Sequence, residues 1–232
     1  MHHVEIPEEH LARVVRRRGT LHPFAAFAPA TAALVVVDMQ NAFVAPGGLA
    51  EVPQARAIVA NINRLAGALR AAGGLVVWVR GHVESERGPW ALYLKSFEAK
   101  PGAWTATLKR GADGWKFWHE MDVQPEDVVV HKDRYSAFYG PDDLNGLLRR
   151  RGIATVVVAG TLTNSCCEST ARDAMNHDYQ TIMVMDANAC RSDADHLATM
   201  STFIMSFGDV LATDAIVQHL AQYRRNATAS AA

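Results

Sequence analysis

Three side chains that could together perform covalent catalysis each stand at or just after the end of a short apolar run. Asp38 ends the first run, Lys132 ends the third, and Cys166 follows the fourth, where a helix is expected to begin. A thiol can attack a carbonyl carbon, a partly desolvated carboxylate can take the thiol proton, and an ammonium can stabilise the developing negative charge. The sequence therefore predicts a cysteine-dependent acyl-transfer site. Taken singly, Asp38 and Lys132 also fit a buried ion pair or a helix cap, and Cys166 fits a small core residue.

The segment before Cys166 supports the reactive interpretation. Residues 160–166 (GTLTNSC) lead from an apolar strand into a helix, so the thiol is expected in the first helical turn. Unpaired N–H groups and the helix dipole favour a thiolate at that position. The same N–H groups can receive the oxyanion that forms when a thiolate attacks a carbonyl.

Six apolar runs alternate with stretches of helical periodicity, as in a parallel sheet covered by helices. The expected strands are residues 33–38, 75–80, 127–132, 154–159, 180–186 and 209–213. The expected helices are residues 53–72, 141–150, 165–177, 193–206 and 214–223. This order predicts an α/β fold, a doubly wound three-layer sandwich with a six-stranded parallel sheet and the all-apolar first strand near its centre. Ligands bind at the carboxyl ends of the strands in such sheets, where the three side chains should meet.

The chain is divided into an N-terminal arm (1–31), one α/β domain (32–224) and a frayed tail (225–232). The arm is expected to form a helix followed by an extended segment, with three arginines (16–18) on a solvated face or in a contact between subunits. An insertion at about 81–121 fits no single element and carries four of the five tryptophans, namely Trp90, Trp104, Trp115 and Trp118. Such an insertion is typical of a lid or an interface, or its aromatic residues form a satellite packing cluster.

Composition excludes several classes of protein. The 232 residues are 49% hydrophobic and 20% charged, with 23 basic and 24 acidic side chains, so nothing favours binding to nucleic acid or to an anionic membrane. No apolar run approaches the roughly 20 residues needed to cross a bilayer. The first ten residues are polar and acidic and do not resemble a secretory signal, which predicts a cytoplasmic location. The three cysteines are therefore expected to be free thiols.

Three motifs identify a family. Residues 36–43 (VVDMQNAF), 132–138 (KDRYSAF) and 160–166 (GTLTNSC) resemble the isochorismatase-like cysteine hydrolases in sequence and in order. The resemblance extends from about Ala32 to Leu220. Within the superfamily it is strongest to the ureido-amide branch, which includes ureidoacrylate amidohydrolase and the biuret and triuret hydrolases.

The resemblance assigns roles to these residues. It implies that Asp38 is the general acid/base, that Lys132 stabilises the nucleophile and the developing charge, and that Cys166 is the nucleophile. It implies a cis peptide bond between Leu162 and Thr163, and an oxyanion hole made of the N–H groups of Thr163 and Cys166. It also implies a homo-oligomer, with a tetramer favoured.

The candidate substrate contacts lie near these motifs. A planar ureido group needs polar partners and flat apolar walls, and the candidates are Asn41, Phe43, Arg134, Tyr135, Phe138 and lid tryptophans. Gln40 is expected to fix the turn that holds Asp38. Cys167 should face the core, since one residue turns a helical side chain by roughly 100 degrees. Cys190 is also expected to be a packing residue.

The sequence departs from the metal-binding nicotinamidases of the superfamily. Those enzymes carry an Asp-x-His segment after the second strand, where this chain has Arg80, His82 and Glu84. A lone histidine beside Glu84 is poor ligand spacing, so His82 is expected at the surface or in an interface. No metal and no cofactor is implied.

The sequence therefore predicts a cysteine-dependent amidohydrolase that cleaves a C–N amide bond of a small ureido compound and releases ammonia. Biuret, triuret, ureidoacrylate and N-carbamoyl amides all stay open as substrates. Two alternatives belong to other classes of protein. In one, Cys166 and Cys167 form a thiol redox switch. In the other, the domain is a catalytically silent assembly module, which requires that the groups at the strand ends do not converge.

Overall fold

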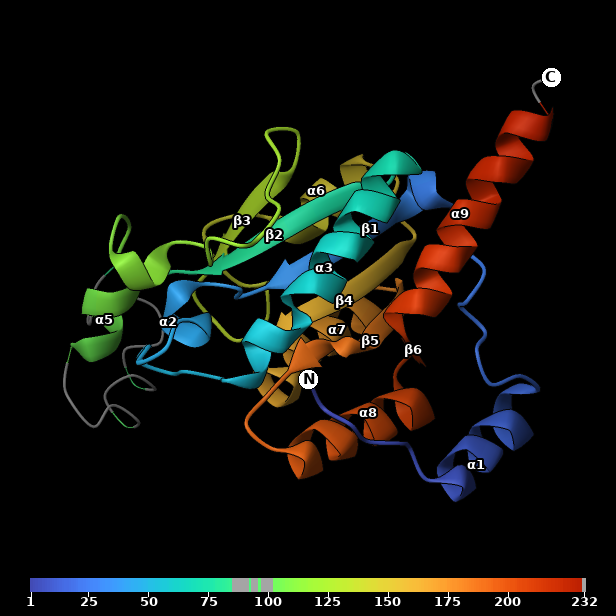
Figure 1. Cartoon of the computed structure of the whole chain (residues 1–232), viewed down its shortest axis with the longest axis horizontal. Helices are drawn as coiled ribbons and strands as arrows, with labels where there is room; N and C mark the ends of the chain where they lie inside the picture. Colours follow the sequence, from blue (N-terminus) through green and yellow to red (C-terminus); the bar gives the residue numbers. More distant parts are fainter. Residues whose placement is uncertain (85–91, 93–95, 97–101, 231–232) are drawn as a thin grey trace.

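The computed structural model of the chain describes residues 1–84, 92, 96 and 102–230 (Figure 1). Six parallel strands form one sheet in the order β3-β2-β1-β4-β5-β6. Their bounds are β1 Ala32–Val37, β2 Leu75–Gly81, β3 Val128–Lys132, β4 Thr155–Thr161, β5 Gln180–Ala189 and β6 Asp209–Leu211. The sheet starts from β1 and grows outward in both directions, so the predicted doubly wound fold is confirmed.

Helices cover both faces of the sheet (Figure 1). The α-helices of the described residues are α1 Glu8–Arg18, α2 Asn41–Val44, α3 Gln54–Ala71, α5 Ala103–Leu108, α6 Leu144–Arg150, α7 Glu168–Asn176, α8 Asp193–Ser206 and α9 Thr213–Ser230. Short 3-10 turns lie at η1 Pro29–Thr31 and η2 Asp113–Trp115, and a π-helical turn, η3 Thr163–Cys167, precedes α7. The expected positions of the long helices agree with these bounds to within a few residues, apart from the end of α9.

The two cores explain why β1 is central. Leu34 and Val36 point into a core formed with α3 and α9, whereas Val35 and Val37 point into a core formed with α6, α7 and α8. Successive side chains of a strand point to opposite faces, so a strand covered on both faces must be apolar throughout. All six residues of β1 are buried.

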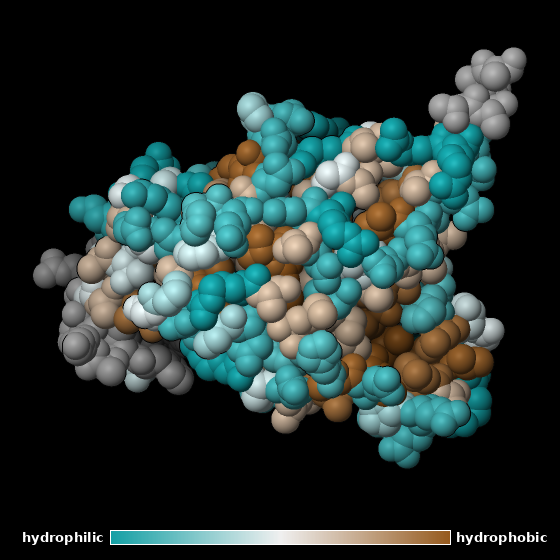
Figure 2. All heavy atoms as spheres, viewed as in Figure 1, coloured by the Kyte–Doolittle hydropathy of each residue, from teal (hydrophilic) through white to brown (hydrophobic). Residues whose placement is uncertain are grey.

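The N-terminal arm packs on the domain. Its helix α1 lies against α8, where Arg17 donates to the Met205 carbonyl and Arg18 donates to the Gly208 carbonyl at 2.8 Å. These two arginines therefore make contacts within the chain. Farther along the arm, His22 contacts the buried carboxylate of Asp209 at 2.7 Å. Figure 2 shows hydrophobic atoms gathered near the base of α9, where the arm crosses this face.

The C-terminal residues differ from the expectation of a frayed tail. Helix α9 continues to Ser230 and projects from the body of the domain (Figure 1). Ala227 and Ala229 favour helix, and the preceding turns already provide the nucleus that an isolated segment lacks. Within the described residues, no helix combines the length and the apolar character of a membrane-spanning segment.

Candidate active site

The strand register brings the three predicted catalytic side chains to one edge of the sheet. Val37, the last residue of β1, pairs with Val79 of β2 and with Gly160 of β4. Lys132, the last residue of β3, pairs with Gly81. Because parallel strands in this register end at similar levels, Asp38 and Lys132 meet the turn η3 that carries Cys166.

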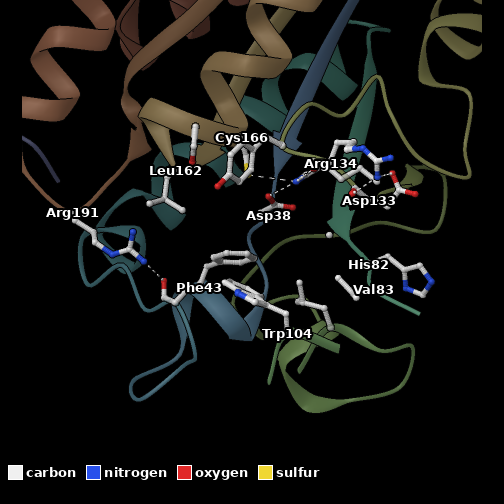
Figure 3. A pocket seen from close by; sticks show the side chains of 16 residues that line it. Asp38, Phe43, His82, Val83, Trp104, Asp133, Arg134, Leu162, Cys166 and Arg191 are labelled. Carbon is white, nitrogen blue, oxygen red and sulfur yellow. Dashed lines mark hydrogen bonds and ion pairs between the residues drawn. The ribbon is translucent and has the colours of Figure 1, made fainter. Parts of the chain in front are cut away.

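Lys132 connects the other two groups. Its Nζ lies 2.8 Å from Oδ2 of Asp38 and 3.5 Å from Sγ of Cys166, and it donates to the Arg134 carbonyl at 2.8 Å (Figure 3). The exposed fractions of Asp38, Lys132 and Cys166 are 0%, 3% and 5%. In a site that excludes most water, these charges interact far more strongly than they would at the surface. The structure thus brings together all three residues predicted from the strand ends.

Asp38 is held in an unusual backbone conformation. Its φ of 51° lies in the left-handed region, which costs a residue other than glycine free energy and needs support from its surroundings. The Asp38 N–H donates to the Val79 carbonyl at 3.1 Å, and the Asp38 carbonyl accepts from the Thr161 hydroxyl at 3.1 Å. Close approach of β4 to β1 also requires Gly160, because a Cβ there would lie 2.1 Å from the Val37 carbonyl oxygen.

Gln40 fixes the turn after Asp38, as its position in the sequence suggested. Its side-chain oxygen accepts from the Gly81 N–H at 2.7 Å, and its side-chain amide donates to the carbonyls of Gly81 and Trp115 at 3.1 and 3.0 Å. The side chain is fully buried. It therefore joins the end of β1, the end of β2 and the segment around η2 into one rigid wall beside Asp38.

The charges of the site define its resting state. Burial would lower the pKa of Lys132, but the nearby charges of Asp38 and Cys166 outweigh burial and raise it, so Lys132 is an ammonium. Burial raises the pKa of Cys166 to about 12; Lys132 opposes this rise and the Asp38 carboxylate adds to it. Burial therefore opposes the thiolate that a position at the start of a helix favours, and favours the protonated thiol in the resting site. The thiol is protonated and must lose its proton when it reacts.

The turn before Cys166 corrects the predicted cis peptide. The cis bond joins Thr161 to Leu162, one residue earlier than the expected bond between Leu162 and Thr163. Strand β4 runs through Thr161, and Thr163 already opens the π-helical turn, so the link between the two elements consists of Leu162 alone. Thr163 is fully buried, and its hydroxyl contacts Nδ1 of His196 at 2.9 Å.

A cavity of about 200 Å³ opens in front of these groups (Figure 3). It is lined by Asp38, Phe43, Ala50, Gly81, His82, Val83, Trp104, Leu108, Lys132, Asp133, Arg134, Tyr135, Leu162, Ser165, Cys166 and Arg191. Of the predicted substrate contacts, Phe43, Arg134 and Tyr135 line it. The cavity is therefore small, polar where the strand ends meet it, and apolar on the side of Phe43.

Aromatic residues form one wall of the cavity. The rings of Phe43 and Trp104 lie 6.0 Å apart and tilted, and both face the space beside Asp38. Trp115 packs instead on Arg80 and His131, away from the cavity lining. The predicted insertion thus supplies both a cavity wall and a packing cluster. Trp90 lies outside the described residues.

Two predicted substrate contacts lie elsewhere. The Asn41 side-chain amide donates to the main-chain carbonyl and the carboxylate of Asp113, and so ties η2 to the start of α2. Phe138 packs against the rings of His177 and Tyr179. Neither side chain lines the cavity, whereas Tyr135, in the same turn after β3 as Phe138, does.

His82 corrects the expectation of a surface or interface position. It is 8% exposed, lines the cavity, and its Nε2 lies 2.9 Å from the Glu84 carboxylate. The backbone explains the burial, because the His82 N–H donates to the Lys132 carbonyl at 2.9 Å and so extends the contact of β2 with β3. The sequence offered one signal for this placement, a histidine directly after a strand end.

Ser165 and Arg191 line the cavity and were not predicted to do so. Ser165 precedes Cys166, the candidate nucleophile, and could have been inferred from its motif. Arg191 lies two residues after the end of β5, which continues three residues beyond the expected end at Asp186. Because the expected strand ends too early, the sequence did not predict that Arg191 lies at the cavity.

A second buried cluster lies beside the turn η3 and consists of His2, Cys190 and His196. It is called the histidine cluster below. The potential metal-ligating atoms of these three residues lie within 4.8 Å of one another. The ring nitrogens of His2 already contact the Asp193 carboxylate at 2.6 Å and the Cys190 N–H at 3.1 Å. Those of His196 contact the Thr163 hydroxyl at 2.9 Å and the Met185 carbonyl at 3.0 Å. These hydrogen bonds leave no ring lone pair for a metal ion.

The other two thiols are buried outside the cavity lining. Cys167 is fully buried among the residues that pack against α8, and burial raises its pKa well above the ordinary value. Cys190 is also fully buried, and its thiol donates to the Ser192 carbonyl at 3.3 Å. Their side chains pack as the sequence suggested, and Cys166 is the thiol of the described residues that faces the cavity.

Comparison with known proteins shows the family of the chain. The family model described as the isochorismatase domain matches residues 32–215. The chain belongs to the isochorismatase family. It is 40% identical over 171 residues to the ureidoacrylate amidohydrolase RutB of Variovorax paradoxus (strain S110), which is 67% of each chain.

Solved structures of isochorismatase-like hydrolases share the fold. A cysteine hydrolase from Pseudomonas syringae pv. phaseolicola 1448A aligns with a TM-score of 0.77 and 32% identity, over 85% of this chain and 95% of that one. The N-carbamoylsarcosine amidase of Thermoplasma acidophilum aligns with a TM-score of 0.66 and 30% identity, over 79% of this chain and 97% of that one.

Proposed function

We propose that this member of the isochorismatase family is a cysteine-dependent amidohydrolase that cleaves a C–N amide bond of a small ureido compound and releases ammonia. The observation that carries the proposal is the position of Lys132, 2.8 Å from the Asp38 carboxylate and 3.5 Å from the Cys166 thiol at the bottom of a cavity. Similarity to a ureidoacrylate amidohydrolase and to an N-carbamoylsarcosine amidase supports the same bond type.

The first chemical step in this proposal couples proton transfer to attack. The resting thiol has a raised pKa, so Asp38 takes its proton as the sulfur bonds to the ureido carbon. Lys132 stays an ammonium and stabilises the negative charge as it moves from carboxylate to sulfur and then to the carbonyl oxygen. Asp38, now protonated, gives its proton to the leaving amine as the C–N bond breaks.

The second half of the reaction regenerates the thiol. Asp38 activates a water molecule that attacks the carbamoyl or acyl group on Cys166, and the thiol leaves with a proton. A released carbamate then decomposes to ammonia and carbon dioxide. Phe43 and Trp104 act as the wall against which a planar ureido group packs, and Arg134 and Tyr135 are its candidate polar contacts.

The oxyanion is assigned to backbone N–H groups of the turn at Cys166. The N–H of Cys166 is one donor in this proposal. The predicted partner, Thr163, is not among the residues that line the cavity, whereas Leu162 is. We therefore propose the N–H of Leu162, and not that of Thr163, as the second donor to the oxyanion.

The two alternatives have less support. A redox switch needs two accessible thiols with low pKa values, but the Cys167 thiol packs in the core and the pKa of each thiol is raised. A silent assembly module requires that the groups at the strand ends do not converge, and here they lie within ion-pair distance.

The proposal is tested by ammonia release from biuret, triuret, ureidoacrylate and an N-carbamoyl amino acid. We expect the wild type to hydrolyse at least one of these compounds, and Cys166→Ala to lose at least about 1000-fold of that activity. Cys190→Ala, which removes a thiol outside the cavity, is the matched control and should keep most of the activity. Full turnover by Cys166→Ala would rule out the covalent mechanism.

The assembly and the location of the protein are separate parts of the proposal. We propose a homo-oligomer, with a tetramer favoured, acting on a small-molecule substrate in the cytoplasm. Light scattering coupled to size-exclusion chromatography measures the assembly directly. A monomer at micromolar concentration would contradict this part and leave the chemistry untouched.

A further inference from the structure

The N-terminal arm places one histidine in the interior of the domain. The side chain of His2 is fully buried, whereas His3, the next residue, is exposed. His2 contacts the Asp193 carboxylate at 2.6 Å and the Cys190 N–H at 3.1 Å. Its ring also stacks on that of His196. Both ring nitrogens therefore have partners in the interior, which holds the His2 ring in one orientation.

The partners of His2 fix the tautomer of its ring. The hydrogen bond from His2 lowers the pKa of Asp193, so this carboxylate is ionised near pH 7 and can only accept a hydrogen bond. Nδ1 of His2 therefore carries the proton and donates to Asp193. A main-chain N–H can only donate, so Nε2 accepts from Cys190. One ring of the arm thus joins the first turn of α8 to the residue that follows β5.

His196 connects His2 to the turn η3. Its Nε2 donates to the Met185 carbonyl at 3.0 Å, because a carbonyl oxygen only accepts. The ring is neutral near pH 7, so its Nδ1 accepts from the Thr163 hydroxyl at 2.9 Å. Thr163 opens η3, three residues before Cys166. The stacked ring of His2 therefore limits the positions that the start of η3 can take.

His2 also supports a second segment at the cavity. Cys190, whose N–H it accepts, is the first residue after β5. The next residue, Arg191, lines the cavity. Two parts of the cavity lining, the turn η3 and the segment after β5, therefore depend on one side chain of the arm.

The rest of the arm holds His2 in place. Figure 1 shows the arm running beside α8, the helix that carries His196. His2 contacts the first residue of α8, Asp193, and the helix α1 packs against α8. Near the end of α8, Arg17 donates to the Met205 carbonyl. The arm therefore contacts α8 at both of its ends.

We propose that His2 is a positioning residue for the cysteine chemistry, which acts through His196 to hold the turn η3 in its reactive position. The inference rests on the proposed function. His2 is not among the described residues that line the cavity, so it does not contact the substrate. Loss of its ring should lower kcat and leave KM nearly unchanged, because Phe43 and Trp104, on other elements, form the wall against which the substrate packs.

His2→Ala tests this assignment in ammonia release from a ureido compound that the wild type hydrolyses. We expect kcat to fall by about 5- to 10-fold and KM to stay within about twofold. His2→Gln keeps an oxygen that can accept from the Cys190 N–H and should recover part of the loss. His3→Ala, which removes the exposed neighbouring histidine, is the matched control and should behave as the wild type. An unchanged kcat in His2→Ala, or a change in KM alone, would overturn the inference.

A double variant tests the route through His196. Residues that act through one another have effects that do not add in free energy. In a His196→Phe background, where the hydrogen bond to Thr163 is already lost, His2→Ala should lower kcat by at most about a further twofold. If the two losses multiplied in full, His2 would not act through His196 and the inference would be overturned.

Hydrogen exchange separates this inference from the proposed chemistry. Amides of η3 should exchange at least about fivefold faster in His2→Ala than in the wild type, and those of α3, in the core on the other face of the sheet, should be unchanged. Faster exchange in both elements would show a general loss of stability and would overturn the inference. A wild type that hydrolyses no ureido compound would reject the proposed function, and faster exchange confined to η3 would still support the hold of His2 on this turn.

Discussion

Two buried polar clusters flank the turn η3, and they differ in whether all their polar atoms have hydrogen-bond partners. The triad of Asp38, Lys132 and Cys166 lines a cavity, and Oδ1 of Asp38 has no hydrogen-bond partner among the described residues. The histidine cluster lies off the cavity, and every ring nitrogen in it has a partner. Buried polar groups normally use all their hydrogen bonds, so the unused capacity at Asp38 indicates a ligand site.

The two clusters also differ in charge. Lys132 and Asp38 form an ion pair, whereas burial lowers the pKa of His196 to about 4, which leaves that ring neutral near pH 7. The rings of His2 and His196 stack with centroids 4.3 Å apart. The comparison teaches that one cluster can move protons, while the other holds Thr163 and the turn in place.

The largest expected effect comes from Asp38, the proposed proton acceptor. Asp38→Asn removes the base, and ammonia release should fall by about 100- to 10,000-fold. The same change should lower the pKa of the Cys166 thiol, because the Asp38 charge raises it. The ultraviolet absorbance of the thiolate, followed against pH, measures that shift. A variant with a lower thiol pKa and full activity would show that Asp38 is not the base.

A smaller loss is expected from the histidine cluster. His196→Phe keeps a stacked ring but removes the hydrogen bond to Thr163, which should lower kcat by about tenfold with little change in KM. His196→Gln, which can still offer a polar atom to Thr163, should recover part of the activity. If His196→Phe were as inactive as Asp38→Asn, the division between the two clusters would be wrong.

The free energy of unfolding should depend on pH through the ring of His196. Burial lowers the pKa of His196 from 6.5 to about 4, so the unfolded chain binds a proton there that the folded chain does not. The contribution of the neutral His196 ring to the free energy of unfolding is complete above pH 6.5 and is lost as the pH falls toward 4. The free energy of unfolding should therefore decrease by roughly 2 kcal/mol between pH 7 and pH 4.5. The free energy of unfolding, measured with urea and plotted against pH over this range, should change less for His196→Phe than for the wild type. Parallel curves would contradict the assignment.

The smallest effect on turnover should come from Cys167. Cys167→Ser places a hydroxyl in an apolar core, which should cost about 1–3 kcal/mol of stability. Activity at a temperature where the variant is folded should stay within about threefold of the wild type. An inactive but folded Cys167→Ser would give Cys167 a chemical role and would overturn the choice of Cys166 as the nucleophile.

The sequence predicted the fold, and the convergence of three side chains at one edge of the sheet, because the relevant signals are local. An apolar run of strand length followed by a polar residue marks a strand end, and the carboxyl ends of parallel strands share one edge of the sheet. Asp38, Lys132 and Cys166 each follow that rule. Phe43 lines the cavity because it lies in the short helix α2 that directly follows the Asp38 turn.

The rest of the site depends on contacts between distant segments. Asn41 lies in the same short helix as Phe43 but turns to Asp113, 72 residues away, and no local pattern distinguishes the two. His82 is buried because its N–H extends the pairing to β3. Arg191 reaches the cavity because β5 is ten residues long, and Asp186 and Asn188 interrupt the apolar run that would have predicted continued pairing.

The sequence by itself determined the order of elements, the centre of the sheet and the three side chains at its carboxyl edge, since periodicity and strand ends are properties of neighbouring residues. The tertiary structure alone decided the charge state of Cys166, the place of the cis bond and the position of Arg191 at the cavity. Each of these depends on burial or on pairing between segments that only folding brings together. A thiol at a helix start is predicted to be acidic until the depth of its burial is known, and here burial prevails.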